Sequence, residues 1–252
     1  MKRSQWTVMV MAIGLVTLFA GGSARAEATH EWHTIAAAPG QLDAVHARLR
    51  DRVLPALDSH GLRGVAVLTP AADNPDRLVH LIVAVTPEAA AADRLAALPE
   101  WQAIVTGSSP LATPRSVQRL HTTPWSPSPA ASADAAARVF ELRTYTSPDA
   151  AKRTALLSRF EHHTLGLFQK HGMTNVIYWT PDGGPDADTK LVYLLAHASP
   201  AAAKASFDAF RQDPDWTAAK TASETAAGGS LTIKEKGVVS EFLAPTDYSP
   251  LR

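Results

Sequence analysis

The two halves of this chain repeat each other, and the repeat constrains the fold more than any other feature of the sequence. The segment that ends in His60-Gly61 aligns with the segment that ends in His171-Gly172, at an offset of 111 residues. Three later matches keep the same order: residues 78–81 with 191–194, 99–101 with 214–216, and 125–127 with 248–250. Their offsets only grow, to 113, 115 and 123, which indicates small insertions in the second half.

The repeat divides the chain into an N-terminal half, residues 27–127, and a C-terminal half, residues 139–252. Residues 128–138 contain Pro129 and several alanines but few large apolar side chains, and we interpret them as a linker. Hydrophobic periodicity predicts the order β-α-β-β-α-β in each half, which is the ferredoxin-like plan of an α+β fold. The predicted strands lie near residues 32–35, 64–68, 78–85 and 116–121, and at 139–146, 174–180, 191–197 and within 231–243.

One such module packs both of its helices on one face of its sheet and leaves the other face bare. Two linked modules can cover each other's bare faces and close into one intrachain, pseudo-dimeric α/β barrel with a cavity between the sheets. In the alternative interpretation, the halves are independent domains that each pair with another chain.

The N-terminus is typical of a secretory signal peptide. Lys2 and Arg3 precede an apolar run over residues 7–20, and Ala24-Arg25-Ala26 matches a cleavage site. The run is shorter than the roughly 20 residues that span a bilayer as a helix. We therefore expect a signal peptide at residues 1–26, a mature protein that is periplasmic or secreted, and no membrane partner for it.

Composition excludes several kinds of partner and site. Without residues 1–26 the chain has 21 basic against 24 acidic residues, a net charge of about −3, so nucleic-acid binding has no electrostatic support. The absence of cysteine excludes disulfides, thiolate metal sites and a cysteine nucleophile. The nucleophile elbow, the phosphate loop, the dinucleotide fingerprint and His-Glu-x-x-His are also absent. We predict no cofactor and no metal.

Six segments of the C-terminal half match one known family in order. They are residues 141–145, 163–172, 178–181, 191–195, 210–216 and 245–250. On these segments the C-terminal half resembles the NIPSNAP family, and the resemblance implies the dimeric α/β-barrel fold. The N-terminal half is a degraded version, in which His33, Ile35 and Arg52 stand at the positions of Arg143, Tyr145 and His163. A site that needs the latter three groups would occur once per chain.

The strand at residues 139–146 is the main candidate for a ligand site. Alternation puts its polar side chains, Glu141, Arg143 and Tyr145, on one face, and Phe140, Leu142 and Thr144 on the other. We expect the apolar face, with Phe140, to pack against the helices, so the polar face would line the cavity. There Arg143 would bind a carboxylate or another oxygen-rich group. Alternatively, Glu141 and Arg143 form a structural ion pair.

Other candidates are a histidine and three aromatic residues. We expect His163 on the margin of the buried face of its helix. There it would act as a general base or contact a ligand. Alternatively, it bridges helix and sheet in a structural role. Tyr178, Trp179 and Tyr193 are expected to form aromatic walls of the cavity, or alternatively to belong to the core.

Two histidines of the N-terminal half are weaker candidates. His80 aligns with Tyr193, so the two should share a sheet face. His33 and His80 could lie close together in the barrel, but two histidines without an acidic or thiolate companion are weak evidence for a metal or haem site.

These observations leave three hypotheses of function. The first is an exported protein that binds a small organic molecule, anionic or aromatic, in the barrel cavity. The second, by analogy with other dimeric α/β barrels, is a cofactor-independent monooxygenase or isomerase, and the third is a non-catalytic scaffold for a partner protein. A ligand site requires an open cavity that Arg143 and Tyr145 reach, whereas a scaffold would have that space filled. Further oligomerisation stays open.

Overall fold

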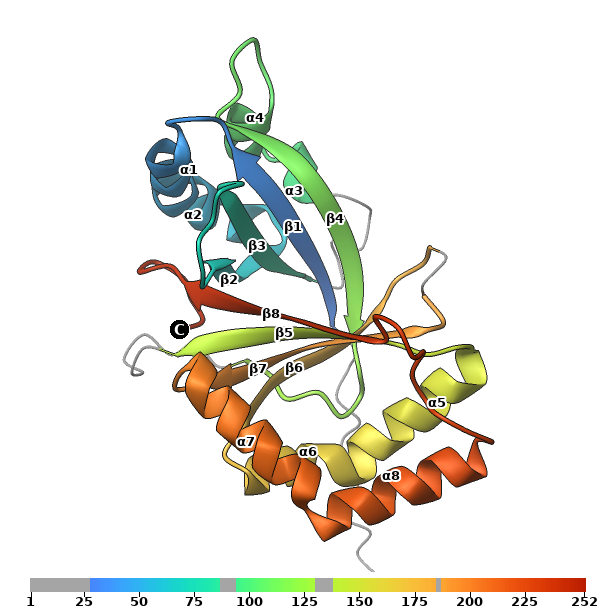
Figure 1. The fold of residues 1–252 in the computed structure, drawn as a ribbon. Helices are drawn as coiled ribbons and strands as arrows, with labels where there is room; N and C mark the ends of the chain where they lie inside the picture. The colour runs from blue at the N-terminus through green and yellow to red at the C-terminus, as the bar shows by residue number, and fades with distance from the viewer. Residues whose placement is uncertain (1–27, 87–93, 130–137, 185–186) are drawn as a thin grey trace, which may run out of the picture.

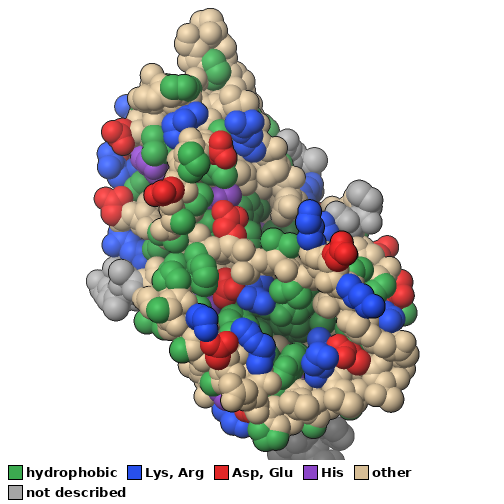
Figure 2. All heavy atoms as spheres, viewed as in Figure 1, with side chains coloured by type: hydrophobic (Ala, Val, Ile, Leu, Met, Phe, Trp, Pro, Cys, Tyr) green, Lys and Arg blue, Asp and Glu red, His purple; other side chains and the backbone are tan. Residues whose placement is uncertain are grey.

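A computed structural model describes residues 28–86, 94–129, 138–184 and 187–252. The predicted signal peptide and most of the predicted linker lie outside these ranges. Among the described residues, no helix has both the length and the apolarity needed to cross a membrane. Figure 2 shows acidic and basic side chains interspersed over one face of the molecule.

Each half of the chain runs strand, helices, two strands, helices, strand (Figure 1). The elements of the N-terminal half are β1 (Thr29–Ala37), α1 (Leu42–Arg48), a π-helical segment (Leu49–Val53), α2 (Leu54–Ala56), a 3-10 turn (Asp58–His60), β2 (Leu62–Pro70), β3 (Leu78–Val85), α3 (Arg94–Ala97), α4 (Pro99–Val105) and β4 (Ala112–Thr122). Those of the C-terminal half are β5 (Val139–Thr146), α5 (Ala150–Arg159), a π-helical segment (Phe160–Thr164), α6 (Leu165–Lys170), β6 (Thr174–Pro181), β7 (Lys190–His197), α7 (Pro200–Gln212), α8 (Pro214–Ala226) and β8 (Val238–Pro245).

The eight strands form one closed antiparallel barrel in the order β1-β3-β2-β8-β5-β7-β6-β4. Two short junctions join the halves: β2 pairs with β8 from Leu68↔Pro245 to Pro70↔Leu243, and β4 pairs with β6 from Leu120↔Pro181 to Thr122↔Trp179. The prediction of a mixed α+β barrel within one chain is confirmed. The halves share one sheet, so the alternative of two independent domains is wrong.

The core has three parts, because both faces of the sheet are covered. The barrel interior is filled from both halves by Trp32, Leu68, Phe140, Trp179 and other apolar side chains. Two further clusters lie on the outer face of the sheet, one under α1–α4 and one under α5–α8 (Figure 1).

The end of each half crosses to the other half. After β4, the Ser126 hydroxyl accepts a hydrogen bond from the backbone nitrogen of Tyr178 at 2.9 Å, and the Trp125 ring packs 5.2 Å from the Tyr178 ring. After β8, the Ser249 hydroxyl accepts from the backbone nitrogen of Val67 at 3.0 Å. These contacts reinforce the two short strand junctions.

Candidate functional site

Strand β5 is oriented opposite to our prediction. Phe140 lies in the barrel interior, whereas Tyr145 packs beneath the helices, with its ring 5.5 Å from those of Phe160 and Tyr193. Glu141 and Arg143 therefore face the helices and not the cavity. The prediction was wrong because it treated apolarity as a mark of the helix-covered face, while the interior of this barrel is equally apolar.

Arg143 is the centre of a buried polar network. Its Nη1 donates to Glu141 Oε1 at 2.5 Å, its Nε donates to Tyr193 Oη at 3.0 Å, and its guanidinium lies 4.3 Å from the Phe207 ring. The other Glu141 oxygen lies 3.2 Å from His197 Nε2. Burial acts to raise the pKa of the Glu141 carboxyl, but the hydrogen bonds with His197 and Arg143 outweigh burial and hold this pKa below its ordinary value. This geometry is that of the ion-pair alternative.

The three predicted aromatic residues do not line one cavity. Tyr178 and Tyr193 stack under the helices with ring centroids 5.0 Å apart, and both are fully buried. Burial raises the pKa of both phenols well above 10, so they are neutral hydrogen-bonding groups. Trp179 points the other way, into the barrel interior.

His80 and Tyr193 lie on opposite faces of the sheet, contrary to our prediction. His80 Nδ1 accepts a hydrogen bond at 3.2 Å from Trp32 Nε1 in the barrel interior. The strand register explains the error: Arg143 pairs with Tyr193, and its counterpart His33 pairs with Leu81. The sequence alignment of β3 with β7 was thus displaced by one residue, which exchanges the faces. His33 and His80 also lie on opposite faces.

His163 is exposed and lies on the outer surface of the helical layer. It borders a groove between α5 and α8, together with Arg159 and Ser223. The structure therefore does not place it at the margin between helix and sheet, and it does not approach the barrel interior.

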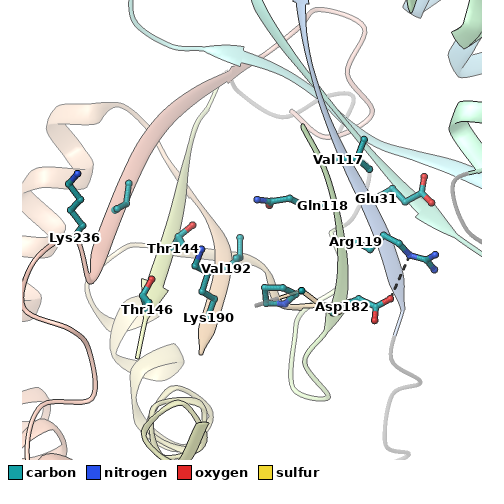
Figure 3. Close-up of a pocket in the computed structure, with 14 residues that line it drawn as sticks. Glu31, Val117, Gln118, Arg119, Thr144, Thr146, Asp182, Lys190, Val192 and Lys236 are labelled. Atoms are coloured by element: carbon teal, nitrogen blue, oxygen red, sulfur yellow. Dashed lines mark ion pairs between the residues drawn. The ribbon is translucent and has the colours of Figure 1, made fainter. Parts of the chain in front are cut away.

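A cavity of about 890 Å³ opens at one end of the barrel between the two halves, and we call it the barrel-mouth cavity (Figure 3). It lies where β4 and β8 extend beyond their short junctions with the other half. Its lining consists of Glu31, Val117, Gln118, Arg119, Thr144, Thr146, Pro181, Asp182, Gly183, Gly184, Lys190, Val192, Lys236 and Val239.

Inward-facing positions of three strands supply the polar lining. Gln118 of β4 points across the cavity toward Thr144 of β5 and toward Lys190 and Val192 of β7 (Figure 3). Thr144 and Val192 are register partners, so both occupy the interior face of the sheet. Deeper in the barrel the same face carries bulky aromatic residues, whereas threonine and valine at this end leave the space open.

Among the described residues that line the barrel-mouth cavity, cationic side chains outnumber carboxylates by one. Three cationic side chains border it, those of Arg119, Lys190 and Lys236, against two carboxylates. Both carboxylates already contact basic groups. Asp182 Oδ2 lies 3.6 Å from Arg119 Nε and 3.3 Å from His121 Nε2. Glu31 Oε2 lies 3.0 Å from His33 Nε2. A concave site with excess positive charge and apolar walls is suited to a small anion with an apolar part.

The sequence analysis missed these residues, although a signal was present. Thr144 and Thr146 belong to the strand that we singled out, on the face that we assigned to the helices. Lys190 is the first residue of β7, and it faces inward because its register partner is Thr146. Across the described ranges, no cluster of three or more metal-ligating side chains occurs.

Comparisons with known proteins find a family likeness in the C-terminal half. Residues 140–250 match the NIPSNAP family model. A NIPSNAP family protein of unknown function from Agrobacterium tumefaciens is 21% identical, over 46% of this chain and 94% of that chain, with a TM-score of 0.38. No curated protein sequence matches this chain.

Two solved structures resemble nearly the whole chain. A putative monooxygenase from Fusobacterium nucleatum has a TM-score of 0.55 at 8% identity, over 88% of this chain and 93% of that chain. A mutant chlorite dismutase from Candidatus Nitrospira defluvii has a TM-score of 0.52 at 10% identity, over 86% and 92%. At these identities the likeness shows the barrel fold alone.

Proposed function

We propose that this protein binds a small organic anion in the barrel-mouth cavity. The observation that carries the proposal is the placement of the Lys190 ammonium, the Gln118 amide and the Thr144 hydroxyl around one open space of about 890 Å³. Ligand sites of this size usually combine apolar walls with a few convergent polar groups. Here Val192 and Val239 provide the apolar walls.

The carboxylate of the ligand would lie near Lys190, with Lys236 contributing charge at the rim. Lysine binds an anion as a point charge, and the neighbouring amide and hydroxyl donors would orient its oxygens. The network around Arg143 would then stabilise the helix-covered face of β5. The catalytic alternative, a monooxygenase or isomerase, has support from fold likeness alone.

The proposal includes export and internal duplication. The residues before Glu27 favour a periplasmic or secreted protein. The identical order of elements and the reciprocal contacts of Ser126 and Ser249 support two ferredoxin-like modules that arose by duplication, with the C-terminal module closer to the NIPSNAP family.

The test is a thermal-shift screen of aromatic and short-chain carboxylates, without medium-chain fatty acids, against their neutral amides. A carboxylate at 100 times its Kd should stabilise the wild type by about 2.7 kcal/mol. Lys190→Met should abolish the shift and Thr144→Val should weaken it. Lys204→Met, a lysine variant on the exposed surface of α7, should retain it. A panel without any stabilising carboxylate, or an equal shift in Lys190→Met, would overturn the proposal.

A further inference from the structure

Helices α5 and α8 lie side by side in the outer helical layer (Figure 1). The second concave feature is a groove of about 570 Å³ between them. It lies outside the barrel, so it is separate from the barrel-mouth cavity. Most of its lining is small: Ala151, Ala155 and Ser158 from α5, and Ala219, Ala222, Ser223, Ala226 and Ala227 from α8 and its end. We call it the α5–α8 groove.

Arg159 and Lys152 of α5 contact α8 and the segment that follows it. Near one end, the Arg159 guanidinium lies 5.0 Å from the Trp216 ring, and its Nη1 lies 3.3 Å from Ser223 Oγ and 3.7 Å from a Glu224 oxygen. Toward the other end, Lys152 Nζ donates to the Ser230 carbonyl at 3.1 Å. The alanine side chains between these bridges are too short to fill the space, so an apolar slot remains.

Arg159 provides the observation that indicates a ligand. The residue is only 5% exposed, it borders the groove, and its Nε is buried without a hydrogen-bond partner. A guanidinium has five N–H donors, and a buried donor without an acceptor is unfavourable. Its partner Glu224 is shared, because Lys220 Nζ lies 2.7 Å from the other oxygen. Burial lowers the pKa of Arg159, although the nearby Glu224 carboxylate acts to raise it.

The other basic side chains that line the groove favour an anion as well. His163 and Lys152 border it. Among the described lining residues, the carboxylate is that of Asp149, which already accepts a hydrogen bond at 2.8 Å from the Lys152 backbone nitrogen at the start of α5. An occupant should therefore carry a negative head, which lies near Arg159, and an apolar body, which contacts the alanine methyl groups.

We propose that the α5–α8 groove binds an amphipathic monocarboxylate, such as a medium-chain fatty acid, with its carboxylate at Arg159 and His163 and its chain along the alanines. The groove volume lies within the range of about 300–1,000 Å³ that is typical of small-molecule sites. The site also assigns a role to His163, a candidate residue that the barrel-mouth cavity does not use. The inference is independent of the proposed function, because the two sites share no residue.

The test is calorimetric titration of the purified protein with decanoate, below the concentration at which it forms micelles. We expect one decanoate per chain and at least tenfold weaker binding of decanol, which lacks the carboxylate. Ala222→Leu, at an exposed position of the groove, should weaken decanoate binding at least tenfold by filling the slot. Ala205→Leu, the same change at an exposed position of α7 outside the groove, should leave binding unchanged.

Further variants separate this site from the barrel-mouth cavity. His163→Gln should weaken decanoate binding, whereas Lys190→Met should leave it unchanged. Decanoate binding that is lost in Lys190→Met but retained in Ala222→Leu would place the fatty acid in the barrel mouth and overturn the proposal. Equal affinity for decanol and decanoate, or no binding of either, would also overturn it. Circular dichroism of each variant shows whether the fold is intact.

Discussion

The Ser249 hydroxyl accepts a hydrogen bond from the backbone nitrogen of Val67 at 3.0 Å, across 182 residues of sequence. The same hydroxyl donates to the Leu251 carbonyl at 2.6 Å, and the preceding Tyr248 Oη lies 2.6 Å from His46 Nδ1 on α1. The C-terminal tail therefore holds the first half of the barrel along β2, where β8 provides only a short strand junction.

Ser249→Ala should destabilise the protein by about 1–3 kcal/mol, because the buried Val67 N–H would lose its acceptor. Urea denaturation measures the change in the free energy of unfolding. Ser230→Ala removes an exposed serine hydroxyl on the same half of the chain and should change this free energy by less than about 0.5 kcal/mol. An equal effect of the two variants would mean that the tail contact contributes nothing.

Arg143→Met should destabilise the protein by about 3 kcal/mol, because Glu141 would remain buried without its main cationic partner. Arg50→Met removes an exposed ion pair with Asp51 and should change stability by at most about 1 kcal/mol. If Arg143→Met instead keeps wild-type stability and loses binding of small carboxylates, the network around Arg143 is a ligand site after all. Denaturation and the thermal-shift screen together decide between these outcomes.

Stability should fall as the pH is lowered from 6.5 toward 4. Burial lowers the pKa of His30 and of His80 from 6.5 to about 4, so both are neutral in the folded protein. The unfolded chain takes up these protons below pH 6.5, and acid therefore favours unfolding by about 3 kcal/mol for each histidine at pH 4.

Urea midpoints measured from pH 7 to pH 4 check this dependence. His80→Asn retains an acceptor for Trp32 and should flatten the decline over this range. His162→Gln, at an exposed position, should leave the decline as in the wild type. A wild-type stability that does not change between pH 6.5 and 4 would contradict the prediction.

Two glycines at the end of the first long helix of the C-terminal half should respond in opposite directions to alanine. Gly172 has φ +76°, and a Cβ there would meet nothing closer than 3.8 Å, so Gly172→Ala should cost about 1 kcal/mol from backbone conformation alone. Gly166 lies within α6 with open space around it, and Gly166→Ala should stabilise by up to about 1 kcal/mol. Thermal unfolding of both variants measures the two signs.

The sequence by itself determined the order of strands and helices and the closed α+β barrel. Period-two alternation predicted β5, and apolar runs between turn residues predicted β6 and β7, each within about a residue. His171-Gly172 predicted the end of α6 because glycine readily adopts the left-handed conformation found there. These features are local, or follow from the need to cover a bare sheet face.

Only the tertiary structure decided which side of each strand faces the barrel interior. Alternation separates Phe140 and Thr144 from Glu141 and Arg143, but both faces of β5 are covered, so periodicity cannot say which of them is inside. A one-residue error in aligning β3 with β7 likewise exchanged the faces of His80 and Tyr193. The barrel-mouth cavity depends on contacts between strands of both halves, and such contacts between distant segments leave no periodic pattern along the chain.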